Sequence, residues 1–209
     1  MGAVHSAIGD VADQLAELGL SVDMVHRVVA RADIDARSCT PNHPVNAEGW
    51  FRWANSVRYL RDELVPAGWA RARQLNFELV VRPGGMTAIA VTAGDEATGC
   101  AGVPPRTGNP KGAMTVAAVV ANIGPQTLFE VDSFRRRTWF LLYFRDESEI
   151  RVELSLPDNV SATGYIDSWS ERIILPPYPL EERAGTRSAP DGEPQPELPI
   201  DVPVRRRTS

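Results

Sequence analysis

Apolar residues recur at helical spacing near the start of the chain. In residues 3–19 they lie alternately four and three positions apart, at Val4, Ile8, Val11, Leu15 and Leu18. This spacing places one apolar stripe on a helix, which Gly19 is expected to end. Ser21 can cap a second helix, because its hydroxyl can accept a hydrogen bond from a free amide of the first turn. A helical pair is therefore predicted within residues 1–37.

A third helix is predicted over residues 47–64. Its apolar stripe includes Trp50 and Trp53. An aromatic stripe at helical spacing is typical of a packed face, so the stripe is predicted to lie in the core. The other face carries arginines, and arginines interleaved with tryptophans can stack on bases. No second basic element supports nucleic-acid binding, which therefore stays an unsupported alternative.

Strand patterns dominate the middle of the chain. Residues 75–81 and 86–93 predict a hairpin, with proline and glycine in the turn at 82–85. A continuous apolar run at 138–144 and strict alternation at 149–156 predict a second hairpin. Between them, residues 113–122 indicate an apolar helix. The mixed spacing of 165–175 leaves open whether a short helix precedes a strand there.

These elements predict an α+β fold, with a mainly antiparallel sheet of four or five strands and helices packed on it. Three parts are expected: an N-terminal helical pair at 1–37, a core domain at 45–176, and a tail at 177–209. Eight prolines fall in 176–209, with few large apolar residues. Such a composition cannot bury enough apolar surface to offset chain entropy, so the tail is predicted to be disordered.

Composition narrows the class of protein. The 209 residues are 43% hydrophobic and 23% charged, which is ordinary for a globular chain, and the net charge of -5 argues against general nucleic-acid binding. The two cysteines lie far apart, which favours free thiols in a reducing compartment. The N-terminus lacks the pattern of a signal peptide, and no apolar run approaches the roughly 20 residues of a membrane helix. We therefore expect a soluble cytoplasmic protein without membrane contact.

The loop between the predicted strand at 86–93 and the helix at 113–122 concentrates charged and small residues. Its candidates for ligand or partner binding are Asp95, Glu96, Thr98, Arg106 and Lys111. A loop held between two core elements is a common place for a site, and the first amides of the following helix attract anions. A purely structural alternative is a salt bridge that closes the loop. The lysine lacks the neighbours that a P-loop requires.

Carboxylates at predicted strand ends raise a second hypothesis, a phosphoester hydrolase or nuclease that uses Mg²⁺. Its candidate catalytic residues are Asp95, Glu96, Asp132 and Glu153, with Glu130 nearby. Such nucleases often place a lysine two residues after a glutamate, whereas here that position is Ser155. Glu153 would also fit the solvent face of an alternating strand.

Other catalytic and metal chemistry has little support. Cys39 and His43 lie four residues apart, but a zinc site needs about four ligands, and the chain has only two other histidines and one other cysteine. No metal site is predicted from these residues. A Ser–His pair lacks its usual motif, and Cys100 as a nucleophile would need a base from the N-terminal helices.

Four short stretches together resemble a family of uncharacterised bacterial proteins associated with mobile or defence-related gene clusters. They are Gly94 to Gly99, Pro110 to Gly112, Glu153 to Pro157 and Trp169 to Pro176. The resemblance covers about residues 45–176 and implies no catalytic residues or cofactor. The first hypothesis is therefore a non-enzymatic binding protein of a bacterial accessory system, with loop 94–112 contacting a ligand or a protein partner. The Mg²⁺-dependent hydrolase is the alternative.

Overall fold

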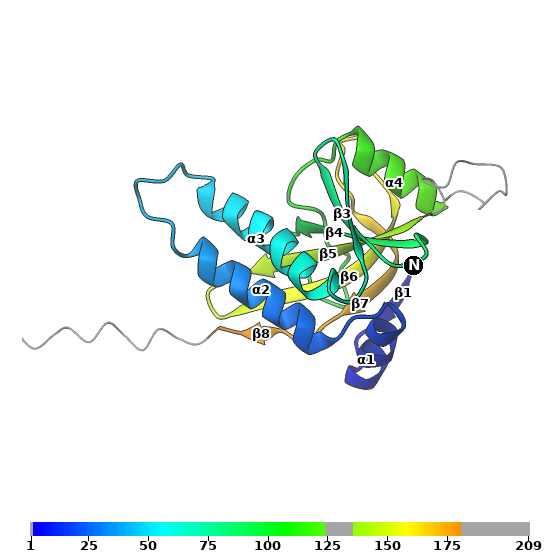
Figure 1. Cartoon of the computed structure of the whole chain (residues 1–209). Helices are drawn as coiled ribbons and strands as arrows, with labels where there is room; N and C mark the ends of the chain where they lie inside the picture. The colour runs from blue at the N-terminus through cyan, green and yellow to red at the C-terminus, as the bar shows by residue number, and fades with distance from the viewer. Residues whose placement is uncertain (1, 124–135, 181–209) are drawn as a thin grey trace, which may run out of the picture.

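The computed structural model describes residues 2–123 and 136–180 (Figure 1). Its helices are α1 (Ile8–Glu17), α2 (Val22–Ala36), α3 (Ala47–Leu64) and α4 (Ala113–Ile123). Its strands are β1 (Ala3–His5), β2 (Ala70–Gln74), β3 (Phe77–Val81), β4 (Thr87–Ala93), β5 (Arg137–Arg145), β6 (Glu149–Asn159), β7 (Ser168–Ile174) and β8 (Tyr178–Pro179). The α+β class is as predicted.

The strands form one mixed sheet of eight strands. Their order is β1-β7-β6-β5-β4-β3-β2, and β8 pairs with β6. The β1–β7 and β4–β5 pairs are parallel, whereas the other pairs are antiparallel. The prediction of a mainly antiparallel sheet of four or five strands is therefore wrong. Both predicted hairpins, β3–β4 and β5–β6, are present.

The missing strands have weak local signals. β1 is three residues long and lies within the apolar pattern that predicted the first helix, which in fact begins at Ile8. β2 alternates alanine with arginine, so it carries no large apolar side chains to mark it. Residues 168–174, left open by the sequence, form a strand between β1 and β6. The parallel β4–β5 pair depends on a long connection through α4, which local patterns do not specify.

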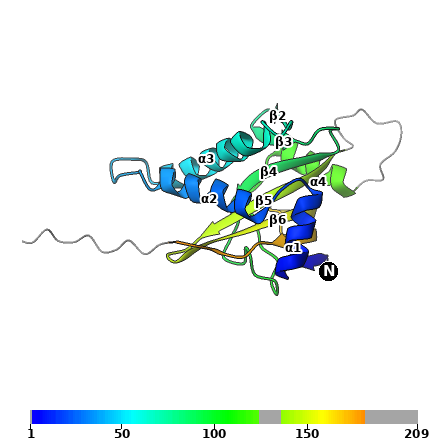
Figure 2. The ribbon, with the colours of Figure 1, turned by 60° about the horizontal axis from the view of Figure 1, so that its bottom comes forward.

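Helices cover both faces of the sheet. Figure 2 shows α1, α2 and α3 on one side of it, and α4 lies on the other. Val11 of α1 and Val25 of α2 belong to the same apolar core as the side chains of β5 and β6 that face them. Val119 of α4 packs in a second cluster, on the opposite face. Within residues 2–123 and 136–180, no helix combines the length and apolar character that crossing a membrane requires.

The tryptophan stripe of α3 only partly enters the core. α3 has the predicted bounds, and its Val57 and Leu60 are buried. Trp53 is half-buried at the edge of the core, however, and Trp50 is 59% exposed. The prediction of a core position is wrong for Trp50, because its side chain lines an open cavity instead of packing against the sheet. Both tryptophans line the cavity described next.

Candidate functional site

The sheet splits between β3 and β4. The two strands pair through only two residues of β3, Val80 and Val81, while β4 continues to Ala93. The remainder of β3 stays paired with β2 and leaves the edge of β4 open. There the indole N–H of Trp53 donates a 3.0 Å hydrogen bond to the carbonyl of Val91. A side chain of α3 thus takes the place that a neighbouring strand would occupy.

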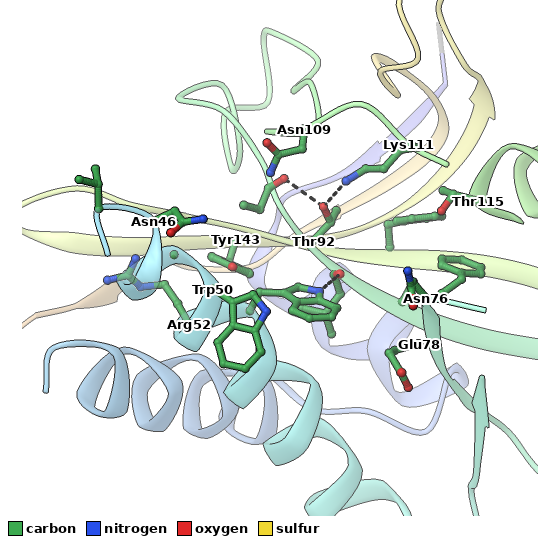
Figure 3. Close-up of a pocket in the computed structure, with 18 residues that line it drawn as sticks. Asn46, Trp50, Arg52, Asn76, Glu78, Thr92, Asn109, Lys111, Thr115 and Tyr143 are labelled. Carbon is green, nitrogen blue, oxygen red and sulfur yellow. Dashed lines mark hydrogen bonds between the residues drawn. The ribbon is translucent and has the colours of Figure 1, made fainter. Parts of the chain in front are cut away.

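A cavity of about 660 Å³ occupies this split and wraps around the edge of β4 (Figure 3). On the α3 side it is lined by Trp50, Trp53 and Tyr143, and on the α4 side by Thr92, Lys111 and Thr115. β3 contributes Phe77 and Glu78. The cavity therefore combines aromatic walls with polar side chains, which make up half of its lining residues, and the lining comes from five segments of the chain. Apolar walls with polar groups that can orient a ligand are a feature of small-molecule sites, although this lining is more polar than most.

Lys111 is the distinctive polar group of this cavity. It is partly buried, and its Nζ donates a 2.6 Å hydrogen bond to Oγ1 of Thr92. Among the described residues this hydroxyl is its only side-chain partner, and no carboxylate pairs with it. Burial lowers the pKa of Lys111 to about 8, because removing water disfavours the charged ammonium. Thr92 Oγ1 in turn lies 3.3 Å from the Ala93 carbonyl, to which it donates.

The other ionisable groups that line the cavity already have partners or stay neutral. Arg52 pairs with the fully buried Asp33 at 3.1 Å. Glu78 accepts hydrogen bonds from two arginines, at 2.8 and 2.6 Å. Burial by itself would raise the pKa of Glu78, but the two arginines outweigh it and lower that pKa. Burial raises the pKa of Tyr143 to about 12, so its phenol is neutral at physiological pH.

A buried ion pair fixes most of the predicted loop to the sheet. Glu153 and Arg172 lie on the α4 face of β6 and β7, with 2.6 Å between Oε2 and Nη2. Glu153 also accepts from the amide of Gly99, while Arg172 donates to the carbonyls of Cys100 and Val103. The polar atoms of this pair therefore bond to each other, to the Ser155 hydroxyl, or to backbone of loop 94–112. The pair therefore anchors residues 99–103 of the loop to the sheet.

The remaining candidates of the loop do not gather at the cavity. Asp95 is half-buried and its Oδ1 accepts from the amide of Ala97, while Glu96 is exposed. Thr98 is fully buried, and Arg106 lies over the ring of Tyr165 with its Cζ 4.4 Å from the centroid. None of these four residues lines the cavity, which Lys111 does. Of the predicted binding residues, Lys111 is therefore the one that faces a space for a ligand.

The predicted carboxylate set is divided. Glu153 does not lie on a solvent face but in the buried pair with Arg172. Asp132 and Glu130 fall outside the described residues. Within the described part of the chain, no three histidine, cysteine, aspartate or glutamate side chains come together as a metal site. The described geometry offers the hydrolase hypothesis no assembled carboxylate cluster.

Sequence reasoning missed the residues that line the cavity together with Lys111, and it missed one strong signal. The tryptophans, Thr92 and Glu78 come from separate elements, so their approach to Lys111 depends on the tertiary fold. The missed signal is compositional: Lys111 is the only lysine in 209 residues, whereas the other 21 of the 22 basic residues are arginine. The count singles out position 111, where the side chain is a primary amine and not a guanidinium group.

The site has to be interpreted from its own residues. The bacterial family indicated by the four short stretches, and the accessory-system role it implies, stay predictions. Comparison of the chain with protein-family models, with curated proteins and with solved structures gives no match.

Proposed function

We propose that this chain is a binding protein whose small organic ligand occupies the cavity between α3 and the open edge of β4. The cavity of about 660 Å³ falls within the range of small-molecule sites, roughly 300–1,000 Å³. Its tryptophans offer flat apolar surface, and polar side chains make up half of its lining residues. A ligand with a planar apolar part and at least one oxygen acceptor suits these walls.

The main support for the proposal is the partly buried amine of Lys111 in the cavity wall. Among the described residues, Lys111 is partly buried with one hydroxyl as its side-chain partner and no carboxylate, and this placement costs free energy because the ammonium loses water. In a purely structural role, an apolar side chain or a paired arginine at this position would have a lower free-energy cost of burial. A ligand that bonds to the amine offsets the cost only when it is bound, which is the behaviour expected of a binding residue.

Trp50 supplies the second support. Its side chain is 59% exposed although it is a large aromatic group, and it lines the cavity that Lys111 also lines. Exposed tryptophan is costly in water and useful at recognition sites, where it gives a rigid contact surface. The two residues approach the cavity from opposite sides of β4 (Figure 3).

The proposal can be tested by screening a fragment library against the full chain with saturation-transfer NMR. Fragments that bind should lose their signal with Lys111→Met and with Trp50→Ala. They should keep it with Ile34→Ala, a matched control that removes another large exposed side chain, 61% exposed on α2 and outside the cavity. Near-ultraviolet circular dichroism would show that each variant remains folded. Fragments that bind equally well to both cavity variants would refute the proposal.

A further inference from the structure

The choice of lysine at position 111 is informative because the chain uses arginine everywhere else. Arginine is protonated at every physiological pH and cannot act as a nucleophile, whereas a lysine amine can lose its proton and react with carbonyl groups. A role limited to positive charge would be available to arginine, as at the 21 other basic positions. What lysine alone supplies at the cavity wall is a primary amine.

The surroundings of Nζ favour the neutral amine. Among the described residues it has no carboxylate to hold its proton, and burial lowers its pKa to about 8. At pH 7.5 about a quarter of the molecules then carry a neutral amine. The charged groups on the facing elements do not change this, since Arg52 is held by Asp33 and Glu78 by two arginines, and Tyr143 is neutral.

Resting on the proposed binding function, we infer that Lys111 holds its ligand covalently, as an imine formed with an aldehyde or ketone group. The lone pair of Nζ adds to the carbonyl carbon, and one Nζ proton passes to the former carbonyl oxygen through the Thr92 hydroxyl or a water molecule. The nitrogen lone pair of this carbinolamine then expels the hydroxyl group, which takes a proton from solvent and leaves as water. The protonated imine that remains returns its Nζ proton to solvent. Amine and carbonyl become imine and water, with no oxidant or reductant consumed.

The geometry also indicates the kind of carbonyl compound. Thr92 Oγ1 lies 2.6 Å from Nζ and can hold the oxygen of the carbinolamine or relay its proton. The tryptophan side chains of the cavity lie on the other side of the β4 edge from Lys111. An apolar planar group attached to the carbonyl carbon can therefore extend toward them. An aromatic aldehyde or ketone fits this arrangement, and reversible imine formation would make its capture tight without a large interface.

The test uses the full chain, benzaldehyde as the probe and cyanoborohydride to reduce any imine to a stable benzylamine. Because these 209 residues hold one lysine, mass spectrometry of the peptides need distinguish only Lys111 from the N-terminal α-amine of the chain used. We expect Lys111 to be benzylated at least about tenfold faster than the α-amine, because binding in the cavity raises the effective concentration of the aldehyde. Lys111→Arg should abolish this labelling and leave that of the α-amine unchanged.

A parallel measurement separates the two proposals. Saturation-transfer NMR with benzyl alcohol, which cannot form an imine, reports binding in the cavity alone, with Trp50→Ala as the variant that removes it. Benzyl alcohol binding together with labelling of Lys111 no faster than the α-amine would overturn the imine and leave the binding function standing. The absence of both benzyl alcohol binding and preferential labelling would overturn both.

Discussion

The pH dependence of stability should report directly on the burial of Lys111. In the folded protein its pKa is lowered to about 8, from the ordinary value of 10.5. Below the folded pKa, the folded and unfolded chains both carry the proton, and the full cost of burying the ammonium is present. As pH rises above that value, the folded amine becomes neutral while the unfolded one stays protonated. The unfolded state then binds more protons, so stability rises with pH.

The size of the effect follows from the two pKa values. Between pH 7 and pH 9.5, the free energy of unfolding of the wild type should rise by about 2 kcal/mol relative to a variant without the amine. The gain should level off above pH 10.5, where the unfolded amine is neutral too. Lys111→Met is the appropriate reference, because methionine has a similar length and does not titrate.

Urea denaturation of both proteins across this pH range measures the difference. All other ionisable groups are present in both proteins, so their contributions to the pH dependence cancel. A difference between wild type and Lys111→Met that stays constant within about 0.5 kcal/mol from pH 7 to 9.5 would show that the lysine is fully hydrated, and would remove the main support for the proposed site.

Three further predictions concern stability measured by urea denaturation. Glu153→Gln should lower the free energy of unfolding by about 3–5 kcal/mol, since it leaves the buried guanidinium of Arg172 without a counter-charge. The exposed Glu96→Gln is the control. Equally small losses in the two variants would contradict a structural role for the ion pair. Trp53→Phe should cost about 1 kcal/mol through loss of the hydrogen bond to the edge of β4, and no loss would mean that water satisfies this carbonyl equally well. Trp50→Ala should change stability by less than about 0.5 kcal/mol, because most of its side chain is exposed; a larger loss would place it in the core.

The spacing of apolar residues correctly predicted the helices and strands whose apolar side chains recur at regular intervals. α3 was predicted with its observed bounds, because apolar residues recur at helical spacing from residue 50 to residue 64, although Trp50 of that pattern is exposed. The β5–β6 hairpin was predicted from an apolar run followed by strict alternation. β1 and β2 were missed because one is three residues long and the other has no large apolar side chains. Short edge strands depend on partners distant in sequence, and these leave no local signal.

The site was less predictable than the fold. Lys111 was among the candidates because of its position before a helix, but the expected companions in loop 94–112 point elsewhere. The actual neighbours of its cavity come from α3, β3, β4 and β5, and they meet only because β3 departs from β4 after two paired residues. Departure of one strand from another is decided by long-range packing rather than by either strand's own sequence.

The pairing of β1 with β7 also has a consequence for the order in which the protein can fold during synthesis. Residues 3–5 are made before the other described strands, yet their partners are residues 171–173, which follow nearly the whole sheet. The core side chains of α1 and α2 likewise pack against strands that are made much later. Contacts so distant in sequence slow folding, and the apolar stripes of a growing chain stay uncovered meanwhile. Nascent chains that stop before residue 168 should therefore aggregate or recruit chaperones, whereas chains that extend past β7 can close the sheet.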